Sequence, residues 1–207
     1  MMQDDLIEKT LSQWTKGKDK KASRISIFQH IRDIPYAILP ELINYQTGPK
    51  KLLQYKKGSC SPKHFLLGKM FQKLGLKVQY VTYPFYYSQQ DFIFSKRFKD
   101  LIEQLPSFYH LACKVEIKDR DIIVDATWDL ALAKKGFPVN TKWDGMNDTL
   151  LAVKALDEIY HKSPFERKKF VKQKEGEWTD KDRINVRRFC KEFNMWLDEI
   201  RDSVSSS

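Results

Sequence analysis

The strongest constraint on the fold is a segment that begins a helix with a cysteine in its first turn. After residues 58–62 (Gly-Ser-Cys-Ser-Pro), apolar residues recur at the spacing of one helical face, at Leu66, Leu67, Met70, Phe71 and Leu74. Ser59 or Ser61 can accept a hydrogen bond from a free amide of the first turn, where Pro62 is also favoured. Gly75 suits the left-handed position after the last turn. The sequence therefore predicts a capped helix over residues 60–74 with Cys60 at its N-terminus.

Alternating polarity predicts strands that follow this helix. Residues 76–80 alternate apolar and polar side chains, and so do residues 109–117, where His110 lies on the face opposite Leu111 and Cys113. Residues 118–121 have the composition of a turn, and residues 122–125 read as the returning strand of a hairpin. The predicted fold class is α+β with an antiparallel sheet.

Further helices are predicted towards both ends of the chain. Residues 6–14 and 26–34 carry apolar side chains at helical spacing, and Pro35 ends the second of these helices. One apolar stripe along residues 186–200 predicts a final amphipathic helix that packs on the domain. Residues 149–160 are apolar enough for a strand or a helix, and their pattern does not decide between the two.

An aromatic-rich insertion at residues 83–106 separates the predicted strands. Its second half, residues 94–105, has the composition of a helix. Excursions of this kind often carry function, so we expect this one to form a lid or a wall of a substrate site. Its aromatic residues include Phe85, Tyr86, Tyr87, Phe92, Phe94 and Phe98.

Composition restricts the class of protein. With 207 residues, 42% of them hydrophobic, the chain is predicted to form a single domain over residues 1–207. The formal net charge is +10, but acidic residues are interleaved with basic ones, which indicates a solvated surface rather than a nucleic-acid site. No apolar stretch has the length of a membrane span, and residues 1–10 lack the pattern of a signal peptide. Three widely separated cysteines indicate a reducing compartment, so we expect a cytoplasmic protein.

Cys60, His110 and Asp125 are the candidates for a catalytic triad. A helix N-terminus lowers the pKa of a thiol, because free amides and the helix dipole stabilise the thiolate. A thiolate nucleophile also needs an imidazole within reach and a carboxylate that orients the imidazole. The odd sequence separation of His110 and Asp125 places both side chains on the same sheet face if the hairpin loop has an even number of residues.

The spacing alone leaves the contact between His110 and Asp125 open. A four-residue loop at residues 118–121 would set Asp125 opposite Lys114, too far from His110 without a bulge or a shifted register. Asp125 could instead cap the turn at Thr127, and Asp129 could then serve as the carboxylate.

Three short motifs occur in one order along the chain: Gly58-Ser59-Cys60 at the start of an apolar helix, His110 on a strand, and residues 124–128 (Val-Asp-Ala-Thr-Trp). Together with residues 31–36 (Ile-Arg-Asp-Ile-Pro-Tyr), this order resembles the transglutaminase-like superfamily over roughly residues 25–130. The chain departs from the family pattern at Ala112, where an aromatic residue is frequent, and at Ser61, where an acidic one is. The rest of the chain then reads as an N-terminal helical extension and a C-terminal helical elaboration of this core.

The resemblance implies a papain-like core, in which the Cys60 helix packs against the sheet, and acyl transfer through a thioester. Water as acceptor would make the protein an amidase or peptidase, and an amine would make it a transglutaminase. The expected substrate is a protein or peptide, and no cofactor or metal is expected. The Cys60 amide and Gln54 are the predicted oxyanion donors, while Trp128 and Tyr83 are predicted to contact substrate.

Other interpretations of these residues remain open. The same fold could be a binding module with a degenerate triad, for protein or nucleic acid, or an acetyltransferase that takes acyl groups from a thioester donor. His64, one helical turn after Cys60, could hold a metal with it, although no second pair of ligands is evident. Cys113 and Cys190 lie on apolar faces and are predicted to be core residues.

Overall fold

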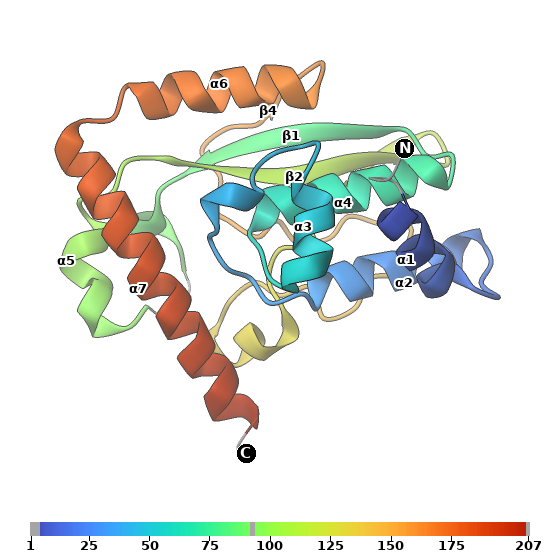
Figure 1. Ribbon diagram of the computed structural model, residues 1–207, viewed down its shortest axis with the longest axis horizontal. Coiled ribbons are helices and arrows are strands. Elements are labelled where there is room, and N and C mark those ends of the chain that lie inside the picture. Colours follow the sequence, from blue (N-terminus) through green and yellow to red (C-terminus); the bar gives the residue numbers. More distant parts are fainter. Residues whose placement is uncertain (1–4, 92–93, 206–207) are drawn as a thin grey trace.

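The computed structural model describes residues 5–91 and 94–205, and at its centre lies a four-stranded antiparallel sheet (Figure 1). The strands are β1 (Val78–Phe85), β2 (Phe108–Ile117), β3 (Arg120–Val124) and β4 (Ile159–Tyr160), in the order β3-β2-β1-β4. All three pairings are antiparallel. The predicted α+β class with an antiparallel sheet is therefore confirmed.

Helices from the N-terminal half of the chain form a group that reaches the sheet through α4. They are α1 (Asp5–Thr15), α2 (Lys20–Arg32), α3 (Gly48–Tyr55) and α4 (Cys60–Lys73), and α4 contacts both β1 and β2. α4 is buried on nearly all sides over residues 60–71, and the apolar residues predicted to face the core, Leu66, Leu67, Met70 and Phe71, are fully buried. A first hydrophobic cluster results, which includes Ile27, Phe28, Leu66, Met70, Phe71, Leu111 and Val115.

A second hydrophobic cluster forms around the C-terminal helix. α6 (Pro164–Gly176) lies along the β1 and β4 side of the sheet, and α7 (Asp180–Ser205) turns away from it and runs down the flank of the molecule (Figure 1). The apolar stripe of α7 packs against the aromatic insertion between β1 and β2. This second cluster includes Tyr87, Phe98, Trp128, Phe189, Phe193 and Trp196.

The β2–β3 hairpin has a two-residue turn, so the predicted four-residue loop is wrong. Lys118 and Asp119 form the turn, with φ of 51° and 59°, and Ile117 pairs directly with Arg120. Positive φ at both central residues matches the twist of a tight hairpin. Because Cys113 pairs with Val124, the same register continued by one residue sets Asp125 beside Ala112 rather than Lys114.

Several helix and strand boundaries differ from the predicted ones for local reasons. α2 begins six residues earlier than residue 26, because the Asp19 carboxylate accepts a hydrogen bond from the Ala22 N–H at 2.7 Å and caps the helix there. β1 continues to Phe85, paired with β2 along its whole length, so the start of the predicted insertion is strand.

The remaining segments with uncertain patterns are mostly irregular. The predicted helix at residues 94–105 is reduced to α5 (Lys99–Ile102), preceded by a single 3-10 turn. Phe92 lies outside the described residues. Residues 149–160 form neither the strand nor the helix considered, apart from the two residues of β4. This connection crosses the end of the sheet and supplies hydrogen bonds to it instead.

A fully buried lysine ties the start of α4 to its surroundings. The Lys63 ammonium donates to the carbonyl oxygens of Arg32 at 2.9 Å, Ile34 at 2.8 Å and Thr127 at 2.6 Å, and the residue is 0% exposed. Three acceptors match the three N–H groups of an ammonium. Lys63 therefore joins α4, the segment after α2 and the segment after β3 at one point.

Replacing this ammonium with an apolar side chain of similar length should destabilise the fold. Lys63→Met leaves three buried carbonyls without a donor, and we expect it to lower the free energy of unfolding by about 2–4 kcal/mol in urea titrations. Lys69→Met on the same helix is the control, because the Lys69 ammonium lies over the Tyr45 ring, 4.7 Å from its centroid, and donates no hydrogen bond to the described residues. Equal effects of the two substitutions would contradict this role for Lys63.

Candidate active site

Cys60 occupies the first residue of α4. Ser59 before it has extended backbone, with φ −81° and ψ −176°, so the helix begins at the cysteine. The Ser59 side chain makes no capping hydrogen bond, and the predicted cap by this residue is not formed. Cys60 is 9% exposed and lines a cavity of about 580 Å³, so its thiol can be reached by a ligand.

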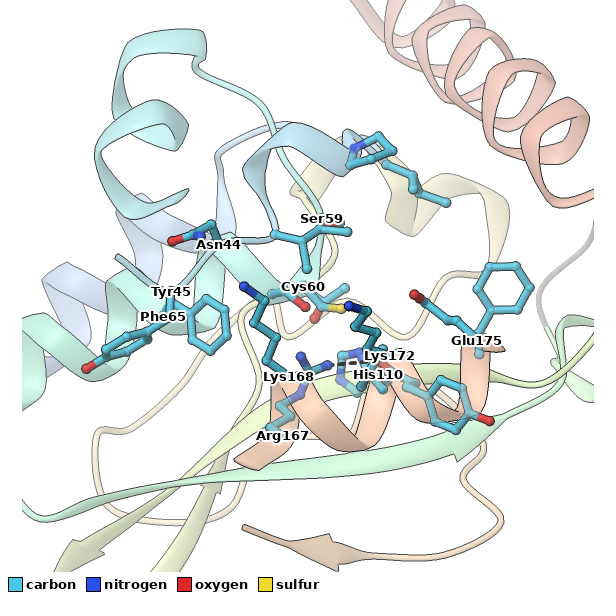
Figure 2. A pocket seen from close by; sticks show the side chains of 18 of the residues that line it. Asn44, Tyr45, Ser59, Cys60, Phe65, His110, Arg167, Lys168, Lys172 and Glu175 are labelled. Atoms are coloured by element: carbon cyan, nitrogen blue, oxygen red, sulfur yellow. Dashed lines mark hydrogen bonds between the residues drawn. The ribbon is translucent and has the colours of Figure 1, made fainter. Parts of the chain in front are cut away.

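His110 lies between the Cys60 thiol and the Asp125 carboxylate. Its Nε2–H donates to Asp125 Oδ2 at 2.8 Å, which leaves Nδ1 for the Cys60 side, and Cys60 and His110 each shift the pKa of the other. Figure 2 shows the Cys60 sulfur directed towards the His110 ring. The contact left open by the sequence is made because the two-residue turn shifts the register, so that Asp125 reaches His110 diagonally across the two strands.

The Asp125 carboxylate is 1% exposed and fully hydrogen-bonded. Oδ1 accepts from the Thr127 N–H at 3.1 Å and the Thr127 hydroxyl at 2.6 Å, and Oδ2 accepts from the Ala152 N–H at 2.8 Å in addition to His110. The Asp125 backbone is fixed by the Thr149 hydroxyl and by the Asn140 side-chain amide. Such bonds favour the charged form and hold it in one orientation.

Asp129, the alternative carboxylate, has a different partner. It accepts hydrogen bonds from Arg201 on α7 at 2.8 Å and from the Tyr36 N–H at 2.9 Å. This ion pair joins α7 to the segment after β3. Asp125 is the carboxylate that contacts His110.

The environment shifts the pKa values of all three groups. Burial acts to raise the pKa of the Cys60 thiol, but the His110 charge and hydrogen bond, the Leu111 N–H and the Arg167 charge together lower it below its ordinary value. Burial acts to lower the pKa of His110, and the charges of Asp125 and Cys60 overcome it and raise that pKa to about 10. Burial opposes the ionisation of Asp125, yet the charge and hydrogen bond of His110 hold its pKa well below the usual range. The shifts of Cys60 and His110 both act towards a thiolate–imidazolium pair.

His64 supports this arrangement rather than a metal. Its Nδ1–H donates to the Cys60 carbonyl at 2.9 Å and its Nε2 accepts from the Ala126 N–H at 3.0 Å, which defines a neutral ring. Burial lowers its pKa, in agreement with that state. Within residues 5–91 and 94–205, no group of three or more His, Cys, Asp or Glu side chains could hold a metal ion.

The other predicted site residues fall into two groups. Trp128 lines the cavity beside Cys60, and its indole N–H donates to the Ala152 carbonyl at 2.8 Å. Tyr83 pairs with His110 across the sheet but does not line the cavity, and its hydroxyl donates to Glu158 at 3.0 Å. Gln54 is exposed on α3 and is not among the residues that line the cavity, so the structure does not bring it to Cys60.

The cysteines outside the triad have raised pKa values. Cys113 is 0% exposed and burial raises its pKa well above the ordinary value. Cys190 lies at the cavity wall, and burial raises its pKa to about 11. Neither has an imidazole partner among the contacts of the described residues.

Sequence analysis missed the contribution of α6. Arg167 is 3% exposed, lines the cavity and is close enough to Cys60 for its charge to act on the thiol. Figure 2 shows it beside His110, with Lys168 and Lys172 on the same helix. From the sequence, residues 167–174 are predicted to form a solvated basic helix. Nothing in the local sequence distinguishes the buried Arg167 from its exposed neighbours.

Comparisons with known proteins give little further identification. No protein-family model matches the sequence, and no curated protein matches it. Among solved structures, the chain is similar to a crystal structure described as a "Putative Cysteine Protease" from Cytophaga hutchinsonii, at a TM-score of 0.43 and 19% identity, over 63% of this chain and 40% of that one. The chain thus spans less than half of that protein's length, and this level of likeness assigns no chemistry to it. None of the described helices is long and apolar enough to cross a membrane.

Removing the Asp125 charge should affect both stability and the thiol. Asp125→Asn leaves His110 buried beside an uncharged amide, so we expect the free energy of unfolding to fall by about 3 kcal/mol. The pKa of Cys60, followed by thiolate absorbance near 240 nm, should rise because His110 then holds its proton less firmly. Asp121→Asn on exposed β3 is the matched control. An unchanged Cys60 pKa in Asp125→Asn would contradict the coupling.

Proposed function

We propose that this chain is a cysteine-dependent acyl-transfer enzyme with a transglutaminase-like core, in which Cys60, His110 and Asp125 are the catalytic triad. The single observation that carries the proposal is the position of the His110 ring, which is hydrogen-bonded to the Asp125 carboxylate and faces the Cys60 sulfur (Figure 2). The order of the three residues along the chain and their elements match the pattern that suggested this superfamily. We further propose that the whole chain is one domain, with α1 and the segments after residue 130 as elaborations of the core.

The proposed reaction has two steps. The Cys60 thiolate attacks an amide carbonyl, the resulting oxyanion collapses, and the C–N bond breaks as the His110 imidazolium gives its proton to the leaving amine. A thioester and a neutral His110 remain. Water or a second amine then attacks the thioester while His110 takes a proton from it, which releases an acid or a new amide and restores the pair.

The oxyanion needs donors other than Gln54. The Cys60 N–H at the start of α4 is one, because first-turn amides have no partner within the helix. Asn44 lines the same cavity, and its Oδ1 already accepts from the Gln46 and Thr47 N–H groups at 2.8 and 3.2 Å. Its Nδ2 is therefore the end that can donate, and we assign Asn44 the role first given to Gln54.

The proposal rests on an activated thiol, which alkylation measures directly. Cys60 should react with iodoacetamide with an apparent pKa below the ordinary 9.0, and the reactive ion pair should persist up to the His110 pKa of about 10. His110→Gln should raise the apparent pKa and slow alkylation at pH 7 by about 10–100-fold. Cys113 and Cys190 provide internal controls in the same digest, because their pKa values are raised.

If Cys60 is alkylated no faster than a model thiol, the enzymatic proposal fails and a binding module remains. Activity itself is tested with dimethylcasein and a fluorescent primary amine. Ammonia release with incorporation of the amine indicates a transglutaminase, and ammonia release alone indicates an amidase. Cys60→Ala should abolish both. Turnover of an acyl-coenzyme A without any amide cleavage would instead support the acetyltransferase alternative.

A further inference from the structure

The cavity in front of Cys60 has one basic wall in otherwise apolar surroundings. Arg167, Lys168 and Lys172 of α6 line it, opposed by a single lining carboxylate among the described residues, Glu175. Figure 2 shows these four side chains around the space that Cys60 and His110 face. The other walls are largely aromatic and include Tyr36, Phe65, Phe85, Tyr87, Phe108 and Trp128.

Arg167 is a buried cation without a carboxylate partner among the described residues. Its Nε–H donates to the Thr82 hydroxyl at 3.0 Å and its Nη2 donates to the Tyr109 carbonyl at 3.0 Å. Nη1 makes no hydrogen bond within the described part of the chain. The charges of Cys60 and Glu175 act on Arg167, but its hydrogen-bond acceptors are neutral, so an anion bound directly to the guanidinium would stabilise it.

The negative charge beside Arg167 changes in the course of the proposed reaction at Cys60. Before the reaction, the Cys60 thiolate and Asp125 together balance His110 and Arg167. Once the sulfur is acylated, Cys60 and His110 are both neutral, and the remaining carboxylate, Asp125, is hydrogen-bonded to His110 rather than to Arg167. An anionic group on the bound acyl chain would replace the charge that the sulfur has lost beside Arg167 and would occupy the space beside Nη1.

We infer that Arg167, with Lys168 and Lys172 at the rim, forms a subsite for a carboxylate, so that the acyl donor carries a carboxylate group next to an apolar or aromatic one. This inference rests on the proposed function, since it assigns the substrate class of the same site. Lys168 and Lys172 lie one helical turn apart and add charge on the exposed side. Arg167 supplies direct donors in a water-poor position, where charged hydrogen bonds are strong.

Protection of Cys60 from iodoacetamide tests the subsite with two matched probes. Sodium phenylacetate and phenylacetamide share an aromatic ring and differ in charge. We expect phenylacetate to protect Cys60 at concentrations at least about tenfold lower than phenylacetamide. Inorganic phosphate at equal ionic strength should protect poorly, because it lacks the apolar group; stronger protection by phosphate than by phenylacetate would overturn the assignment to a carboxylate.

Substitutions on α6 identify the residues responsible. Arg167→Gln should bring the two probes within about twofold of each other, and Lys169→Gln, which removes an exposed charge outside the cavity, should not. If Arg167→Gln does not fold, the double variant Lys168→Gln/Lys172→Gln at the exposed rim should still weaken phenylacetate protection severalfold. Equal protection by both probes in the unmodified protein, or undiminished preference for phenylacetate in Arg167→Gln, would overturn the subsite.

The two proposals can fail separately. Calorimetric binding of phenylacetate to the Cys60→Ala protein reports the subsite without a reactive thiol. If Cys60 is alkylated no faster than a model thiol but the protein binds phenylacetate in preference to phenylacetamide, only the enzymatic function is overturned. If Cys60 is alkylated rapidly but the protein binds both probes equally, only the subsite is overturned. If Arg167→Gln slows alkylation by raising the Cys60 pKa and leaves probe selectivity unchanged, Arg167 stabilises the thiolate and binds no substrate.

Discussion

The hydrogen bond between His110 and Asp125 is the interaction on which the rest of the site depends. Both side chains are almost completely buried, at 2% and 1% exposure, and charges in such a position are tolerated only when paired and hydrogen-bonded. Each carboxylate oxygen of Asp125 therefore has donors from the chain, and the irregular connection after β3 provides them through the Thr127 N–H and hydroxyl and the Ala152 N–H. In the same connection, the Thr149 hydroxyl accepts from the Asp125 N–H and so fixes the backbone of the carboxylate.

The sequence predicts much of the fold and the three central residues of the candidate site. The apolar periodicity of α4, β2 and α7 marks side chains that the fold buries, and periodicity predicts these elements directly. It does not predict that α4 and the middle of β2 are also buried on their other faces. The turn length of the hairpin depends on positive φ at Lys118 and Asp119, residues for which composition gives only a weak signal. The contact between His110 and Asp125 was therefore open until the register was known.

What sequence analysis missed depends on contacts between distant segments. Gln54, the predicted oxyanion donor, lies six residues before Cys60 in the sequence, whereas the cavity is lined by Asn44 from the loop before α3. Arg167 differs from the lysines beside it only because α6 presents that one side chain to Thr82 and Tyr109. Nothing in a single basic stretch encodes which residue will meet the sheet, so tertiary packing decides it.

Cys60 belongs to the first hydrophobic cluster, whereas Trp128, which lines the same cavity, belongs to the second. The cavity beside Cys60 therefore lies on the boundary between two cores. The groups that lower the pKa of the thiol come from β2 and α6, so the sulfur acquires its full surroundings only when both cores have assembled.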